Sequence, residues 1–207
     1  MRSLLDEIIS EVVNKVKKEA LIEVEASGRH IHLTREEIDK LFGKGYKLNK
    51  IKDLSQPGQY ACKERVTITG PKGSIKNVVV LGPERKTTQV EVSLTDALAL
   101  GIKPPIRQSG DLEGTPGITI STELGSVNLD KGLIVAKRHI HITPEDAEKF
   151  GVKDNEVVKV KVFGRRPLIF DDVIVRVNKN FKTYMHIDYD EANSSGFSKG
   201  TLARIIE

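Results

Sequence analysis

The stretch Arg29-His30-Ile31-His32-Leu33-Thr34 (RHIHLT, 29–34) recurs later in the chain as RHIHIT (138–143). Each copy is followed by residues typical of a capped helix of about two turns. A second pair of segments extends the repeat, because QVEVSLTDALALG (89–101) aligns without gaps to YMHIDYDEANSSG (184–196). The sequence therefore indicates two copies of one structural unit.

Short strands dominate both copies. Apolar and turn-forming residues predict strands at 22–26, 66–69, 75–81, 90–93, 133–136, 157–162, 168–170, 173–177 and 184–187. Capping residues and terminal glycines predict short helices at 34–43, 95–100, 143–151 and 190–195, whereas 44–64 has the composition of a loop. Because long crossover helices are absent, we expect a mainly β protein with short capping helices (α+β). Its architecture would be two tandem, pseudo-symmetric small β-barrels.

The repeat also suggests the domain boundaries. We expect a first barrel half over 21–108, a connecting loop region over 109–132 and a second barrel half over 133–207, with strands that the halves can exchange. Residues 1–20 precede the repeat and carry an apolar stripe with helical spacing: Leu4, Ile8, Ile9, Val12 and Val16. This amphipathic helix is either a targeting segment that lies in a partner's groove or a helix that packs on its own barrel or on a second subunit.

Composition excludes several classes of protein. The 207 residues are 38% hydrophobic and 30% charged, which excludes intrinsic disorder. No apolar run approaches the roughly 18–20 residues that span a bilayer, and the charged first twenty residues do not resemble a signal peptide. The 33 basic residues are dispersed and aromatic residues make up 5%, so we expect no nucleic-acid binding. The single cysteine, Cys62, fits a reducing compartment such as the cytoplasm and is more typical of a small buried hydrophobe than of a nucleophile.

The five histidines fall on equivalent positions of the repeat. His30 and His32 form one HxH pair, His139 and His141 form the other, and His186 aligns with Glu91. Because residues i and i+2 of a strand point to the same face, each pair can chelate one cation.

Imidazoles with one carboxylate and no thiolate favour Zn²⁺ first. Six ligands for two ions leave open coordination positions, as catalytic zinc needs, and the repeat alone favours three ligands from each half. Two such ions could polarise a thiol and hold an oxyanion, whereas two purely structural zinc ions that clip the halves together remain the alternative.

Other candidate residues lie near these ligands in sequence or in loops. Arg85 comes six residues before Glu91, where a guanidinium suits a phosphate or carboxylate group, although a surface arginine fits the sequence equally well. Gln56 and Gln59, together with Ser109, lie in glycine-containing loops that offer amide and backbone donors to a ligand.

Taken together, the motifs from about residue 22 to the end resemble the phosphate acyltransferase family typified by the propanediol-utilisation phosphotransacylase. The segments that carry the resemblance are RHIHLT, LSQPGQYA, VTITGPKG, VVVLGPERKTTQVEVSLTDALALGI, SGDLEGTPGI, LIVAKRHIHITPEDA and MHIDYDEANSSG. The resemblance implies a two-barrel, di-zinc enzyme that interconverts acyl-CoA plus phosphate and acyl phosphate plus CoA, with propanoyl or acetyl as the acyl group.

The resemblance also implies roles for individual residues. Carried over by position, it implies two ligand sets that each combine residues from both halves. One set is Glu91, His139 and His141 with the CoA sulfur. The other set is His30, His32 and His186 with water or phosphate. It assigns the phosphate to Arg85, and CoA contacts to Gln56, Gln59 and Ser109. The implied reaction is direct attack of a zinc-bound CoA thiolate on an acyl phosphate held by metal and Arg85.

The expected partners are coenzyme A, phosphate and acyl phosphate, without nucleic acid or membrane, in a homo-oligomer. Some members of the family are directed by their N-terminal segment into a bacterial microcompartment, which would bring residues 1–20 against shell or core proteins in propanediol degradation. Two other classes of function remain open: a di-zinc hydrolase of phosphoesters or thioesters, and a zinc-clipped binding protein without chemistry.

Overall fold

A computed structural model describes residues 21–206, so the amphipathic helix expected in residues 1–20 lies outside the described part of the chain. The described residues divide into two compact units, each assembled from separate stretches of sequence. One unit contains 21–25, 139–185 and 195–206, and the other contains 26–138 and 186–194. Within residues 21–206, no helix has the length and apolar character needed to span a bilayer.

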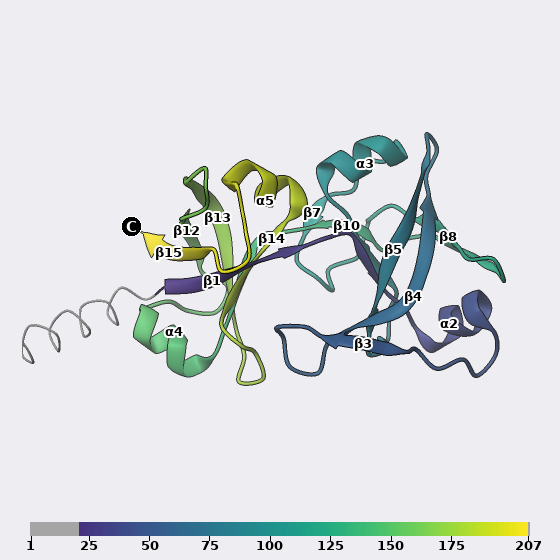
Figure 1. Cartoon of the computed structure of the whole chain (residues 1–207), viewed down its shortest axis with the longest axis horizontal. Coiled ribbons are helices and arrows are strands. Elements are labelled where there is room, and N and C mark those ends of the chain that lie inside the picture. The colour runs from purple at the N-terminus through teal and green to yellow at the C-terminus, as the bar shows by residue number, and fades with distance from the viewer. Residues whose placement is uncertain (1–20, 207) are drawn as a thin grey trace, which may run out of the picture. The chain divides into compact units, whose positions relative to one another are not determined.

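Six strands form a closed barrel in the order β1-β14-β11-β13-β12-β15 (Figure 1). They are β1 (Leu21–Ser27), β11 (His139–Ile142), β12 (Val157–Val162), β13 (Leu168–Val177), β14 (Tyr184–Asp188) and β15 (Leu202–Ile206). Two short helices, α4 (Pro144–Phe150) and α5 (Tyr189–Ser195), follow β11 and β14. Antiparallel pairing of Leu21 with Arg204 joins the first and last described strands and closes the barrel.

A nine-stranded sheet holds the remaining strands, in the order β7-β10-β6-β2-β5-β4-β8-β9, with β3 paired to β4. The strands are β2 (His30–His32), β3 (Lys50–Asp53), β4 (Tyr60–Thr69), β5 (Ser74–Gly82), β6 (Gln89–Glu91), β7 (Ile106–Arg107), β8 (Ile118–Ser121), β9 (Ser126–Leu129) and β10 (Leu133–Ala136). The helices are α2 (Arg35–Phe42) and α3 (Leu94–Leu100). The expected fold class is confirmed: the protein is mainly β, with one closed barrel, one curled sheet and short helices.

The buried core explains why each HxH pair forms a strand. Ile31 between His30 and His32 is fully buried in the apolar cluster of the sheet, and Ile140 of the second pair is also fully buried. Burial of one such side chain contributes about 1.5–3 kcal/mol, so it holds the isoleucine inward and turns the flanking histidines to the opposite face.

Local signals in the sequence define the helices well. Thr34, Ser93 and Thr143 cap the N-termini of α2, α3 and α4 with their side chains, and the helices end at glycines as expected. In α2, Thr34 and Glu37 have the residue types of a capping box, but the Glu37 side chain binds Thr88 instead of the backbone of Thr34. The hydroxyl of Thr88 donates to Glu37 and accepts from the backbone N–H of Thr34, so it lies between the two ends of the box.

Two expected loops contain strands. Residues 44–64 include β3 and the start of β4, and the connecting region 109–132 includes the antiparallel hairpin of β8 and β9. All four residues of β3 are exposed, so the sequence shows no apolar alternation there, and it is the pairing with β4 that makes this segment a strand. The two strands expected at 168–170 and 173–177 are one continuous strand, β13.

Candidate functional site

The first group of candidate ligands consists of His30, His32 and Glu91. Strands β2 and β6 are antiparallel, with His30 opposite Glu91, and His32 lies two residues further along β2. One ligand atom from each side chain lies within 4.8 Å of the others, and the distance from His30 Nε2 to Glu91 Oε2 is 3.4 Å. All three residues are buried, so the strand register places two imidazoles and a carboxylate at one protected point.

Hydrogen bonding orients the ring of His30. Its Nδ1 lies 2.8 Å from the backbone carbonyl of Gly28, and because a carbonyl only accepts, Nδ1 carries the proton and Nε2 faces Glu91. Burial acts to lower the pKa of His30, but the Glu91 carboxylate and the Gly28 carbonyl outweigh it and the pKa is raised. A histidine that donates one nitrogen to a carbonyl and presents the other to a ligand site has the usual arrangement of a metal ligand.

His32 has the opposite electrostatic character. Burial, followed by the charges of His30 and Arg85, lowers its pKa well below the ordinary value, so this ring is neutral. A backbone hydrogen bond at Leu81, which pairs with His32 on β5, acts in the opposite direction but does not outweigh burial. A neutral, buried imidazole that offers a nitrogen beside His30 and Glu91 fits a divalent cation.

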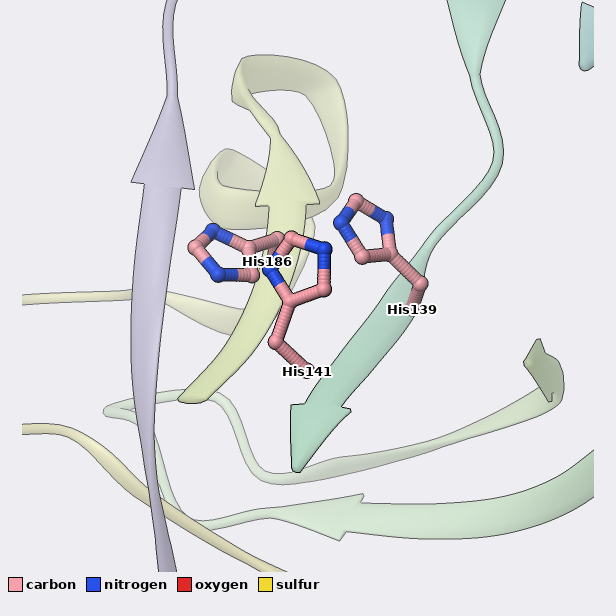
Figure 2. A group of neighbouring side chains, drawn as sticks. All are labelled: His139, His141 and His186. Atoms are coloured by element: carbon pink, nitrogen blue, oxygen red, sulfur yellow. The ribbon is translucent and has the colours of Figure 1, made fainter. Parts of the chain in front are cut away.

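The second group consists of His139 and His141 on β11 and His186 on β14, neighbouring strands of the closed barrel. One nitrogen from each ring lies within 4.8 Å of the others, and Figure 2 shows the three rings clustered together. The ring of Phe181 packs against His141 at a centroid distance of 4.1 Å. Three clustered imidazoles also match a zinc site that keeps an open position.

The structure groups the six residues as the repeat alone predicts, with three from each half. The crossed sets implied by the family resemblance are not the grouping found, and the reason is strand pairing. Glu91 lies directly opposite His30 on the paired strand β6, and His186 lies on β14 beside the β11 pair. Among the described residues, these are the two groups of at least three histidine or acidic side chains close enough to share a metal ion.

A buried glutamine that sequence reasoning missed joins the first group to a loop. The Nε2 of Gln89 donates to Glu91 Oε1 at 2.5 Å and to Ser109 Oγ at 2.8 Å. Its Oε1 accepts from the backbone N–H of Gly110 at 2.8 Å, and since that group only donates, the amide orientation is determined. The available signal was spacing, because Gln89 lies two residues before Glu91 and therefore on the same face of β6.

Arg85 and Ser109 lie together near this network. The Nη1 of Arg85 is 3.4 Å from Ser109 Oγ, and the charge of Arg85 contributes to the lowered pKa of His32. The structure thus brings Arg85 and Ser109 into the surroundings of His30, His32 and Glu91. A guanidinium beside a candidate metal group suits an anionic ligand.

The two glutamines expected to contact CoA differ in their surroundings. Gln56 is buried, and its Nε2 lies 3.3 Å from Nε2 of His186, so it reaches a candidate ligand. Gln59 is half-buried and closes a turn through its backbone, which donates to the carbonyl of Gln56 and accepts from the N–H of Leu54.

Cys62 is buried, and burial raises the pKa of its thiol to about 11, as suits a packing residue rather than a nucleophile.

Comparison with known proteins places these residues in a family context. The family model described as phosphate propanoyltransferase matches residues 23–198, which include both copies of the repeat. A phosphate propanoyltransferase of Clostridioides difficile (strain 630) is 72% identical over 207 residues, covering 100% of this chain and 99% of that protein. Proteins of the same name from Listeria monocytogenes and Thermotoga maritima are 61% and 56% identical, cover 99% and 96% of the chain, and are themselves covered over 96% and 95% of their length.

Proposed function

The chain belongs to the phosphate propanoyltransferase family and is an acyltransferase, and we propose that it interconverts acyl-CoA plus phosphate and acyl phosphate plus CoA. Propanoyl and acetyl are both proposed as acyl groups. They differ by one methylene, and a pocket distinguishes one methylene by only about 1–3 kcal/mol. The observation that carries the proposed site is the clustering of six buried or half-buried ligands in two groups of three.

The two groups are proposed to hold one zinc ion each. His30, His32 and Glu91 would hold the first, and His139, His141 and His186 the second. Bound zinc supplies a Lewis acid that lowers the pKa of a thiol and neutralises an oxyanion. The neutral ring of His32 and the proton on Nδ1 of His30 support this use of the first group.

The remaining chemistry is assigned to protein groups and substrates. The thiolate of CoA attacks the carbonyl carbon of the acyl phosphate, a C–S bond forms, and the C–O bond to phosphate breaks with its electron pair leaving on phosphate. Arg85 binds the phosphate oxygens and stabilises the charge that develops on them. Gln56, Gln59 and Ser109 are proposed to contact CoA. No covalent acyl-enzyme is needed, which agrees with the burial of Cys62.

The alternatives differ in their dependence on phosphate. Loss of acetyl-CoA and propanoyl-CoA should be measured with and without phosphate, together with the zinc content of the purified protein. The proposed reaction consumes acyl-CoA only when phosphate is present and forms one CoA per acyl phosphate. Phosphate-independent consumption would indicate the di-zinc hydrolase, and absence of consumption a zinc-clipped binding protein. A metal-free preparation with full activity would overturn the proposed role of zinc.

The proposed location is the cytoplasm, or a bacterial microcompartment within it when residues 1–20 act as a targeting segment. The apolar stripe of this segment supports docking on shell or core proteins, and the same stripe supports packing on a second subunit in a homo-oligomer. The two uses of residues 1–20 are separated by the deletion experiment described in the Discussion.

A further inference from the structure

An arginine directly precedes each HxH pair and contacts an acid on a helix that follows the third ligand. Arg29 binds Asp96 with two contacts, Nε to Oδ2 at 3.0 Å and Nη2 to Oδ1 at 2.9 Å. Arg138 binds Glu191, with 3.3 Å between Nη1 and Oε1. The same pair of positions is therefore joined in both copies of the repeat, even though the acid differs in length.

The two acids are also parts of helix caps. Asp96 closes a capping box with Ser93 at the start of α3. In the second copy, Glu191 accepts from the backbone N–H of Asp188 at 3.0 Å, and Asp188 accepts from the backbone N–H of Glu191 at 2.8 Å at the start of α5. Each cap begins within two residues of the third ligand, Glu91 or His186, so the position of that ligand depends on where the cap is held.

The first ligand group is held from two sides, and the Arg29–Asp96 ion pair is the contact on one of them. On one side, strand pairing places His30 opposite Glu91. On the other side, Arg29, which is the residue before His30, binds Asp96. Asp96 lies five residues after Glu91. The carbonyl of Gly28 fixes the ring of His30 from the same short segment. Both ends of the ligand pair are therefore held, which limits sliding of β2 against β6.

Asp96 is suited to this task because it is buried while Arg29 is half-exposed. The side chain of Asp96 is 9% exposed and that of Arg29 is 40% exposed. A two-point contact between a guanidinium and a buried carboxylate has a defined geometry that a lysine cannot reproduce. In the second copy the side chains of Arg138 and Glu191 are 29% and 19% exposed, so that pair is also partly shielded from water.

We propose that Arg29–Asp96 and Arg138–Glu191 are matched positioning pairs, each of which holds one metal-ligand group in its binding geometry. The inference rests on the proposed function, because it assumes that both groups bind zinc. Neither arginine is assigned a contact with the reacting atoms. Substitutions that act on the positions of metal ligands commonly reduce metal affinity or activity by about 10–100-fold.

The test measures zinc affinity rather than turnover. Zinc would be titrated against a competing chelator in the wild-type protein and in the variants Arg29→Met and Arg138→Met, with circular dichroism used to verify folding. We expect each variant to bind one zinc ion with native affinity and the other about 10–100-fold more weakly. Arg29→Lys, which keeps the charge and loses the two-point contact, should fall between wild type and Arg29→Met, and it serves as the second variant if Arg29→Met does not fold.

Combination with ligand variants assigns each effect to one group. Adding Arg29→Met to His30→Ala should cause little further loss, because both changes act on the same group. Adding Arg29→Met to His139→Ala should leave no tight zinc site. Arg35→Met is the matched control, because Arg35 contacts Asp39 and Glu84 on the surface and should leave both affinities unchanged.

The outcomes separate the two proposals. A wild-type protein that binds two zinc ions, with Arg29→Met and Arg138→Met unchanged in affinity, overturns the positioning role alone, even if both variants melt at a lower temperature. A folded wild-type protein that binds no zinc overturns the proposed metal function and the positioning role together. Equal weakening of both zinc ions by Arg29→Met also contradicts the inference, because a positioning pair acts on its own group.

Discussion

His30 and Glu91 lie directly opposite each other on the antiparallel strands β2 and β6, with 3.4 Å between His30 Nε2 and Glu91 Oε2. The contact results from register, since Ile31 and Val90 beside them are fully buried in the core. A slip of one residue would turn the apolar side chains outward and the ligands inward, which the core forbids. The packing of the sheet therefore fixes the geometry of the first ligand group.

Removing a ligand should abolish activity while the fold is kept. We expect His30→Ala to lose the zinc ion of the first group and at least about 100-fold in phosphate-dependent turnover, because a group of three ligands is reduced to two. The strand pairing of β2 and the burial of Ile31 remain, so circular dichroism should stay close to wild type. Unfolding of His30→Ala would instead favour the purely structural role of zinc.

Arg85 should act on phosphate more than on acyl-CoA. In Arg85→Lys we expect the KM for phosphate to rise by about 10-fold or more, since lysine cannot bind two phosphate oxygens with a planar fork. The KM for acyl-CoA should change little. Steady-state kinetics with each substrate varied in turn gives both values, and Arg35→Lys on the surface of α2 is the control. Equal changes in both constants would argue against a specific contact with phosphate.

Gln89 should support the Glu91 carboxylate. Gln89→Glu keeps an oxygen for the N–H of Gly110 but replaces the donor to Glu91 and Ser109 by a repelling carboxylate. We expect turnover to fall by about 10–100-fold, with weaker zinc binding at the first group only. Gln89→Met removes the donor without adding charge and should have the smaller effect. If the two variants bind zinc as tightly as wild type, Gln89 has no role in holding Glu91.

The buried carboxylate of Glu64 gives a prediction about pH. Burial acts to raise the pKa of this carboxylate. Its Oε1 accepts hydrogen bonds from Asn49 Nδ2 at 2.7 Å and from the Tyr46 hydroxyl at 2.9 Å. Hydrogen bonds outweigh burial, so the pKa lies below the ordinary 4.5. A lowered folded-state pKa contributes stability above about pH 4.5 that is lost as the pH falls through the folded-state value.

The matching variant is Glu64→Gln, which keeps one acceptor oxygen and removes the charge. We expect its free energy of unfolding to be lower than that of wild type by about 1–3 kcal/mol at pH 7, with the difference shrinking as the pH falls below 4.5. Urea denaturation at a series of pH values measures both curves. A difference that stays constant with pH would show that the charge of Glu64 does not stabilise the fold.

Deletion of residues 1–20 should separate targeting from assembly. If the segment is a targeting helix, a reporter fused to residues 1–20 enters a microcompartment and the truncated enzyme does not, while its oligomeric state and turnover are unchanged. If it packs on a second subunit, deletion changes the mass measured by light scattering and the reporter stays outside. Entry of the truncated enzyme into the compartment would exclude the targeting role.

The sequence carries enough local information to predict most elements. Thr143-Pro144 predicts the start of α4 and Gly151 its end, because capping and left-handed glycine are properties of a few adjacent residues. The alignment of Glu91 with His186 likewise anticipates the third residue of each group, since a repeated unit repeats its strand neighbours. Whether the six residues bind zinc stays a prediction.

Features that depend on pairing between distant segments were not predictable in the same way. Lys50–Asp53 is exposed along its whole length, so only its pairing with β4 makes it a strand. Gln89 donates to Ser109 and accepts from the N–H of Gly110, and these two hydrogen bonds join β6 to a loop some twenty residues away. The ion pair of Arg29 with Asp96 spans 67 residues of sequence, and no local pattern indicates such a contact.

Pairing of β1 with β15 has a consequence for synthesis of the chain. Leu21 and its partner Arg204 are far apart in sequence, so the barrel cannot close until the ribosome has made β15. The strands of the nine-stranded sheet all lie before residue 137, so that sheet can form while the barrel is still being translated. Without β15 the barrel would stay open, and β1 would keep β14 as its one neighbour in the barrel.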